Sequence, residues 1–213
     1  MESIFYSHKY IKDSMKRLSQ ITESIWSDIQ DRSSGESVRK ENQWIVDIIK
    51  EFVERHNFKD GEYKINPDFS LDVYRNISVK SSDLVDGKLP FKFGKIDGTM
   101  WLSDFLGLTT LENSPSELTG SFVLYQNLCE NFIGGPEIVG GNLSANFCRR
   151  LTSLDGSPKE VKGDYSICFC SGLKDISGIS PVIGGNLEIS KNCPFEDDEF
   201  RKYSNIKGQI IRK

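Results

Sequence analysis

The fold of this protein is decided by two consecutive stretches, GNLSANFCRRLTSLDGSPKEVK at residues 141–162 and GDYSICFCSGLKDISGISPVIG at residues 163–184. Each stretch begins with glycine, continues with an alternation of polar and apolar residues, and has a proline near its end. Internal repeats of about 20 to 50 residues are typical of solenoids, in which each repeat forms one coil that stacks on the next. We therefore expect a solenoid in this part of the chain.

The same period covers the C-terminal two thirds of the sequence. The second and fourth residues after each repeat glycine are nearly all apolar, and such alternation indicates a strand with one buried face. A degenerate repeat around Ile77 and Val79 precedes the others, so the pattern predicts about seven strands and about seven coils, with repeats of 21–23 residues. The repeat glycines are Gly98, Gly120, Gly141, Gly163, Gly185 and Gly208.

A second pattern marks the end of each predicted strand. Its form is L-x-L-x-x-N/C, which turns a small polar side chain inward to satisfy backbone groups of adjoining coils. The phase of the repeat sends Cys170 inward and Cys168 outward, so these two thiols are not expected to share a metal ion. The return paths carry apolar residues and then a proline, and we expect them to be extended or 3₁₀-like. The inward residues are Asn127, Cys148, Cys170 and Asn192.

Segments on both sides of the repeats are expected to close the solenoid, because an open end would expose the core and an unpaired strand edge. Residues 62–65 and 70–73 alternate on either side of residues 66–68, a pattern that predicts a β-hairpin. Residues 196–203 begin with acidic side chains, which are favourable at the N-terminus of a helix, and predict one short helix. The leucine-rich-repeat-like solenoid with its two caps should span residues 61–213.

The N-terminal part of the chain has a helical pattern. Four aliphatic residues recur at intervals of seven within residues 3–30, which predicts a long amphipathic helix. After a break at residues 31–35, a second helix is expected to run to about Asn57. We therefore expect an α+β protein whose residues 1–60 form a helical hairpin. The hairpin either caps the solenoid or forms a homodimer through the heptad-spaced residues Ile4, Ile11, Leu18 and Ile25.

The composition excludes several classes of partner. The 213 residues carry a formal net charge of −4, which supplies no field to gather a polyanion, so no nucleic acid is expected as a partner. No run approaches the roughly 18 apolar residues of a membrane span, so we expect no membrane association and a cytoplasmic location. Five cysteines without C-x-x-C spacing and only two histidines predict neither a metal site nor a cofactor.

Two stretches resemble a known group of proteins. Residues 151–163 read LTSLDGSPKEVKG and residues 89–94 read LPFKFG, and both are similar to the leucine-rich-repeat-like proteins encoded by large tailed bacteriophages. The resemblance covers about residues 62–213 and implies a leucine-rich-repeat-like solenoid that acts in the cytoplasm of a host cell. A repeat of this kind identifies an architecture and not an activity.

The outward side chains of the predicted strands provide the candidate binding site. A strand directs the first, third and fifth residues after the glycine outward, giving three columns across the sheet. The first column is uniformly polar and is not expected to bind a partner, while Phe147 and Phe169 are expected to pack into the core. The third and fifth columns form a recognition patch unless the N-terminal helices cover them. Their predicted protein-binding residues are Trp101, Val123, Tyr125, Ser103 and Asn146.

Such a patch predicts a non-enzymatic protein-binding module, since clustered aromatic side chains dominate the binding energy of many interfaces. With the resemblance, the expected role is that of a phage-encoded factor that binds and modulates or inhibits a host protein, including a defence factor. A virion accessory or structural protein, with the helices providing oligomerisation, is the alternative. An enzyme with an unrecognised carboxylate site is less favoured, because the sequence brings no group of acids to one place.

Overall fold

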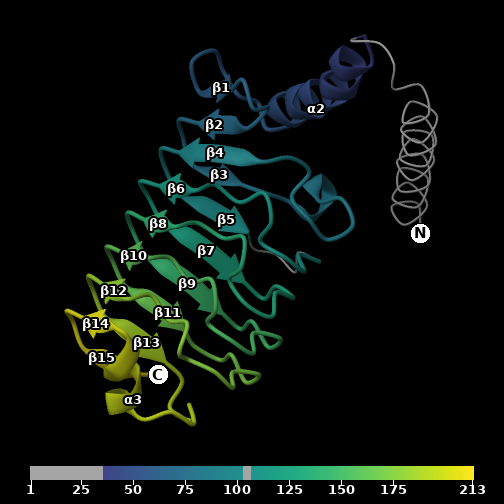
Figure 1. The fold of residues 1–213 in the computed structure, drawn as a ribbon. Helices are drawn as coiled ribbons and strands as arrows, with labels where there is room; N and C mark the ends of the chain where they lie inside the picture. The colour runs from purple at the N-terminus through teal and green to yellow at the C-terminus, as the bar shows by residue number, and fades with distance from the viewer. Residues whose placement is uncertain (1–35, 103–106) are drawn as a thin grey trace, which may run out of the picture. The chain divides into compact units, whose positions relative to one another are not determined.

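The computed structural model describes residues 36–102 and 107–213 and shows a β-solenoid with few helices (Figure 1). The chain separates into two compact units, Met1–Asp47 and Ile48–Lys213, and the solenoid belongs to the second. Successive coils lie side by side along the solenoid, so residues one repeat apart in the sequence become neighbours in space. No helix of the described residues has both the length and the apolar character that crossing a membrane requires.

One sheet contains the seven strands that the repeat predicted, and neighbouring strands pair in parallel. The register follows the repeat, since Tyr165 lies opposite Leu143 on one side and opposite Leu187 on the other. Seven strands enclose only six return paths, so the solenoid has about six coils instead of the expected seven. The strands are β3 (Ile77–Ser78), β5 (Met100–Leu102), β7 (Phe122–Tyr125), β9 (Leu143–Asn146), β11 (Tyr165–Ile167), β13 (Leu187–Ile189) and β15 (Ile210–Arg212).

The six return paths each contribute one strand to a second sheet, and the two strands of the predicted β-hairpin complete its eight strands. The sequence pattern did not predict the six return-path strands. Most of these strands have two residues, too few to show alternation. A signal was nevertheless present, because an apolar residue stands two positions before most repeat glycines, and Leu118, Val139 and Val161 among them are at most 1% exposed. The strands are β1 (Tyr63–Ile65), β2 (Leu71–Val73), β4 (Phe93–Ile96), β6 (Glu117–Leu118), β8 (Ile138–Val139), β10 (Glu160–Val161), β12 (Val182–Ile183) and β14 (Asn205–Ile206).

Apolar side chains from both sheets fill the space between them. The second and fourth residues after Gly141, Leu143 and Ala145, are buried as the alternation predicted. Tyr165 is buried on the next strand, and its hydroxyl group lies 2.9 Å from the hydroxyl group of Ser157, which satisfies the one polar atom of the ring. The resulting apolar column runs through the stacked coils and supports the sheet that carries the candidate site.

In most coils the corner between the two sheets consists of glycine followed by a polar residue. A side chain on Gly163 would collide with Oδ1 of Asn142, and a Cβ atom on Gly141 would lie only 2.7 Å from Oγ of Ser121. Real Cβ atoms do not approach other atoms this closely, so the corner requires glycine. The close stacking of one coil on the next therefore explains why glycine occupies these positions.

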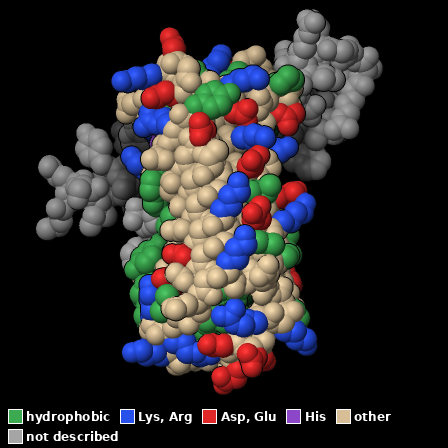
Figure 2. All heavy atoms as spheres, turned by 90° about the vertical axis from the view of Figure 1, so that its left-hand side faces the viewer, with side chains coloured by type: hydrophobic (Ala, Val, Ile, Leu, Met, Phe, Trp, Pro, Cys, Tyr) green, Lys and Arg blue, Asp and Glu red, His purple; other side chains and the backbone are tan. Residues whose placement is uncertain are grey.

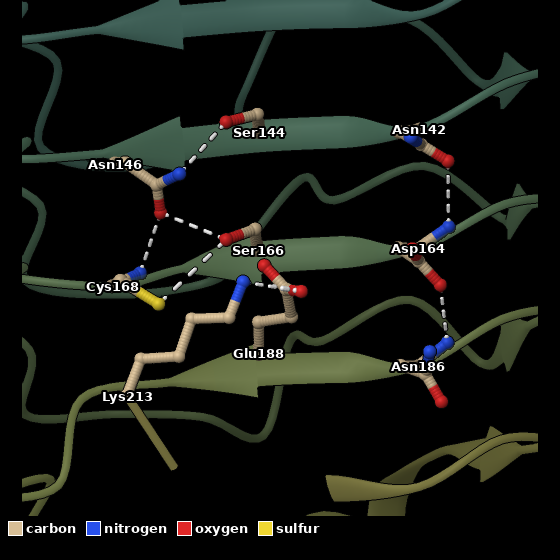
Figure 3. A network of polar contacts seen from close by, with 9 residues as sticks. All are labelled: Asn142, Ser144, Asn146, Asp164, Ser166, Cys168, Asn186, Glu188 and Lys213. Carbon is tan, nitrogen blue, oxygen red and sulfur yellow. Dashed lines mark hydrogen bonds and ion pairs between the residues drawn. The ribbon is translucent and has the colours of Figure 1, made fainter. Parts of the chain in front are cut away.

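The first outward column, expected to be merely polar, forms a ladder of hydrogen bonds along this corner (Figure 3). Each side-chain oxygen accepts a hydrogen bond of 2.7–3.0 Å from the backbone N–H group of its counterpart in the next coil. Figure 2, which views this side, shows a band of uncharged polar groups and backbone with charged side chains beside it. The members of this polar ladder are Asn76, Thr99, Ser121, Asn142, Asp164, Asn186 and Gln209.

The predicted inward Asn/Cys positions are only partly confirmed. Cys148 and Cys170 are buried, and Sγ of Cys170 donates to a backbone carbonyl of the preceding coil at 2.9 Å. Asn127 is also buried, but its side chain accepts a hydrogen bond from the N–H group of Cys129 in its own coil. The prediction for Asn192 is wrong, since this residue is exposed; its coil passes through a helix, Asp197–Tyr203, before it reaches the return strand Asn205–Ile206.

The N-terminal end of the solenoid carries the predicted β-hairpin, in which β1 and β2 are antiparallel. Helix α2 (Glu36–Arg55) corresponds to the second predicted helix. The ring of Phe52, near its end, makes edge contacts with Phe91 and Phe93 at centroid distances of 5.1 and 5.8 Å. This part of α2 therefore packs as a cap. The first predicted helix, residues 3–30, lies outside the described residues, so the helical hairpin and the homodimer stay predictions.

The C-terminal end is closed by the predicted short helix, α3 (Asp197–Tyr203). Its first turn carries the expected acids, and the side chain of Glu199 accepts a hydrogen bond from the backbone N–H group of Glu196 at 2.7 Å, as in a capping box. Phe200 is completely buried and anchors the helix in the core. The guanidinium group of Arg212 on β15 donates to the Asp197 carboxylate at 2.8 Å and so joins the helix to the last strand.

Candidate functional site

The outer face of the seven-stranded sheet carries four of the five predicted binding residues. Trp101 on β5 lies opposite Val123 on β7, and Tyr125 on β7 lies opposite Asn146 on β9. Trp101 and Val123 are half-buried, whereas Tyr125 is 37% exposed. Ser103 lies outside the described residues. The structure thus brings the four described residues to one face of three adjacent strands.

Asn146 belongs to a network of polar contacts on this face (Figure 3). Its Oδ1 atom accepts hydrogen bonds from the Ser166 hydroxyl group at 2.9 Å and from the N–H group of Cys168 at 2.7 Å. Its amide nitrogen donates to the Ser144 hydroxyl group at 3.0 Å. Because these contacts lie within the sheet, Asn146 joins β9 to the end of β11 and has little hydrogen-bonding capacity left for a partner.

Cys168 lies on the outer side of the sheet as predicted, yet it is only 3% exposed. Glu188 and Lys213, whose charged groups are 2.6 Å apart, lie beside it (Figure 3). Burial raises the pKa of the Cys168 thiol, so this group stays protonated at neutral pH and is a poor nucleophile. The geometry favours a packing role for Cys168.

A row of three aromatic side chains crosses the ends of neighbouring strands. The rings of Phe147 and Phe169 stack with their centroids 4.6 Å apart and an interplanar angle of 19°. Tyr125 lies tilted against Phe147 at 5.2 Å. Phe169 is 49% exposed and Phe147 is half-buried, so the expectation that both pack into the core is wrong. We call Tyr125, Phe147 and Phe169 the aromatic row.

The backbone explains why these two rings leave the core. Phe147 and Phe169 have φ angles of +61° and +60°, and Gln126 at the same place in the preceding coil has +55°. This left-handed conformation turns the chain at the end of the strand and ends the alternation that would have pointed the rings inward. Glycine and asparagine adopt it with less strain, so aromatic residues at two successive turns suggest a use for the rings themselves.

A groove of about 380 Å³ opens beside the aromatic row, and we call it the Phe169 groove. Apolar groups provide much of its lining, including the exposed ring of Phe169 and the side chain of Leu173. Among the described residues that line it, Arg149 alone is charged. The walls include Phe147, Arg149, Phe169, Leu173, Ser190 and Pro194.

The ionisable side chains provide no catalytic constellation at this groove. His56 and Asp83 hydrogen-bond to each other at 2.9 Å, and neither residue lines the Phe169 groove. Within residues 36–102 and 107–213, no three His, Cys, Asp or Glu side chains are grouped in a way that could hold a metal ion. The groove therefore offers mainly apolar contact, together with one guanidinium group and a few uncharged polar side chains.

Comparison of the chain with protein-family models, with curated proteins and with solved structures found no match. The functional argument therefore depends on the geometry of the outer face and of the Phe169 groove.

The sequence placed Trp101, Val123, Tyr125 and Asn146 on one face but did not indicate the exposed rings beside them. Phe147 and Phe169 stand one repeat apart, each directly before a buried cysteine, so the sequence showed that they were adjacent. It could not show that the chain turns through positive φ at both positions. That turn changes a predicted core pair into the exposed wall of a groove.

Proposed function

We propose that this protein is a non-enzymatic protein-binding module and that the aromatic row on the outer face of the seven-stranded sheet is its recognition surface. One observation carries the proposal. Three aromatic side chains are aligned on a face whose polar groups, such as those of Asn146 and Ser166, already bond to one another. An outside molecule would therefore gain mainly from contact with the apolar side chains.

Such a surface suits a protein partner. Rigid aromatic side chains lose little conformational entropy on binding and are enriched among the residues that dominate interface energies. Trp101 and Val123, on the strands next to the aromatic row, would extend the contact as half-buried neighbours. The net charge of −4 argues against a nucleic-acid partner, because no excess of positive charge is available to neutralise phosphates.

The resemblance to leucine-rich-repeat-like phage proteins supplies the biological part of the proposal. On that basis the partner is a host protein in the cytoplasm of an infected cell, and binding modulates or inhibits it. The N-terminal helices are proposed to serve as a cap or to pair two copies.

The test compares capture of host proteins from a cell lysate by the full chain and by two variants. Tyr125→Ala and Phe169→Asn should each weaken binding of the captured protein at least about thirtyfold, as expected for loss of an interface anchor. Tyr203→Ala is the control, because Tyr203 is a similarly exposed aromatic residue, 40% exposed, on helix α3. A partner that binds wild type and Phe169→Asn equally well would refute the proposed surface.

A further inference from the structure

We infer that the Phe169 groove accommodates an aromatic side chain of the protein partner together with a carboxylate next to it in the partner's sequence; this inference rests on the proposed function. The bound segment would be a short acidic-aromatic peptide in an extended conformation. The inference depends on three features of the groove. The aromatic row ends at Phe169, the guanidinium group of Arg149 pairs with no described acidic side chain, and the volume is small.

The aromatic row ends at Phe169. Phe147 covers one face of the Phe169 ring at 4.6 Å. The register of β11 with β13 places Lys191 at the equivalent position of the next coil, and no described aromatic ring lies against Phe169 on that side. An aromatic side chain from outside would continue the stack, and an aromatic pair contributes about 0.5–1.5 kcal/mol beyond the burial of area.

The positive charge of Arg149 determines which kind of residue should stand next to the aromatic residue in the partner's sequence. Arg149 is exposed and forms no salt bridge with any described residue, whereas the next residue, Arg150, pairs with Glu130 at 3.2 Å. No acidic side chain is among the described residues that line the groove. A carboxylate is the complement of an unpaired guanidinium group, and the planar group can bind it through two parallel hydrogen bonds.

The size and the remaining walls fit a side chain with a little backbone. A volume of about 380 Å³ lies near the lower end of the range for ligand pockets, so the groove suits part of a peptide better than a large cofactor. Ser190 already accepts a hydrogen bond from the N–H group of Phe169, while Asn192 is exposed and its amide bonds to no other described residue, so it could face peptide backbone. These walls would hold an extended segment across the open side of Phe169.

The experiment titrates the isotope-labelled full chain with two matched peptides and follows backbone amide signals by NMR. The peptides are acetyl-Ser-Trp-Glu-Ser-amide and acetyl-Ser-Trp-Gln-Ser-amide. Both should shift the signals of Phe169 and Ser190, and the glutamate peptide should bind about threefold more tightly, as a partly exposed ion pair allows. Equal affinity for the two peptides, or shifts confined to other parts of the chain, would overturn the inference.

Three variants separate the contributions. Arg149→Gln should remove the preference for glutamate and still bind both peptides, whereas Phe169→Asn should weaken both at least about fivefold. Tyr203→Ala should bind both like wild type. Unchanged amide signals outside the groove will show that each variant is folded. If Phe169→Asn binds the peptides as tightly as wild type, the groove is not their site.

The outcome is independent of the test for the proposed function. Peptides that bind at Phe169 while the full chain captures no host protein would contradict the proposed function and leave the chemistry of the groove intact. Capture that requires the aromatic row, together with no peptide binding, would support the recognition surface and overturn the inference about its partner.

Discussion

Nε2 of His56 lies 2.9 Å from Oδ2 of Asp83, whose side chain is completely buried. The same carboxylate accepts a hydrogen bond from Arg55 at 2.6 Å and one from the backbone N–H group of Lys80 at 2.8 Å. These contacts join the end of helix α2 to the short 3₁₀ helix Ser81–Asp83 beside the first coil. A buried carboxylate with three donors is therefore the polar anchor of the N-terminal cap.

We predict that this anchor weakens in acid. Burial alone would raise the pKa of Asp83, but the hydrogen bonds from His56, Lys80 and Arg55 outweigh burial and hold it below its usual value. Because the folded-state pKa lies below the unfolded value of about 3.9, the contribution is complete above that pH and is lost as the pH falls through the folded-state pKa. This contribution of Asp83 to the free energy of unfolding can be measured by denaturant unfolding of wild type and Asp83→Asn between neutral pH and about pH 3.

At neutral pH Asp83→Asn should lower the free energy of unfolding by about 1–3 kcal/mol, since Arg55 and His56 lose a charged partner. The difference from wild type should shrink below about pH 4. A difference that stays constant across this range would show that the charge of Asp83 is not what holds the cap. Asp60→Asn is the control, because Asp60 is exposed in a turn of the same end of the chain.

A methyl group at a repeat glycine should disrupt the stacking of coils. In Gly163→Ala the new Cβ atom collides with Oδ1 of Asn142 and lies 2.9 Å from the backbone of Gly141, so the corner must shift. We expect a loss of about 1–3 kcal/mol in the free energy of unfolding. Gly107→Ala has open space around its Cβ atom and should change stability by less than about 0.5 kcal/mol. Similar effects in the two variants would argue against close packing at the corner.

At a position of the polar ladder, we expect residues with a side-chain acceptor to replace one another at a lower cost than alanine. Asn142→Ala removes the acceptor for the N–H group of Asp164, which donates at 2.9 Å, and should cost about 1 kcal/mol. Asn142→Ser should cost less, because Ser121 fills the equivalent place one coil earlier and accepts a hydrogen bond at 3.0 Å. Hydrogen exchange of the Asp164 amide should become faster in the alanine variant, and an unchanged exchange rate would contradict the ladder.

Replacing Phe169 should scarcely affect folding. In Phe169→Asn the loss of stacking on Phe147, about 0.5–1.5 kcal/mol, is offset by relief of the left-handed strain, about 1–2 kcal/mol. The free energy of unfolding should therefore change by less than about 1 kcal/mol. Phe122→Ala in the core provides the contrast and should lose about 3–5 kcal/mol. A comparable loss in Phe169→Asn would place that ring in the core after all.

Most of the cysteines should resist modification in the folded state. Cys129, Cys148, Cys168 and Cys170 are buried and only Cys193 is partly exposed. Burial raises the pKa of Cys129 to about 12, so its reactive thiolate is scarce at neutral pH. Treatment with iodoacetamide should add at most one group to the native protein and five in denaturant, as read by intact mass. Two or more additions to the native protein would show that the coils open.

The local and periodic features of this protein could be predicted from its sequence. Alternating residues such as Leu143 and Ala145 indicated a strand because period two is the geometry of a strand with one buried face. The β-hairpin and helix α3 were equally readable, since turn residues and acids at a helix start act within a few residues. The repeat period then predicted that the equivalent strands of successive coils lie side by side.

Features that depend on contacts between coils were decided by the tertiary structure. Most return-path strands of the second sheet have only two residues, too few for an alternating pattern, and they form because the stacked return paths can pair. Asn142 and Asp164 looked like exposed polar residues until stacking placed one as the acceptor for the other. Cys168 is buried on the outer side of the sheet, where side chains from later coils lie beside it.

The candidate site shows the same division. Repetition determined that Tyr125, Phe147 and Phe169 belong to successive coils, because Phe147 and Phe169 occupy the same place of the repeat and Tyr125 stands one residue before that place. The exposure of Phe147 and Phe169 was decided by backbone angles at the turns, and those angles are set by how each coil packs on its neighbour. Periodicity encodes which residues are adjacent, whereas the direction of a side chain after a strand ends depends on a turn that only the packed structure determines.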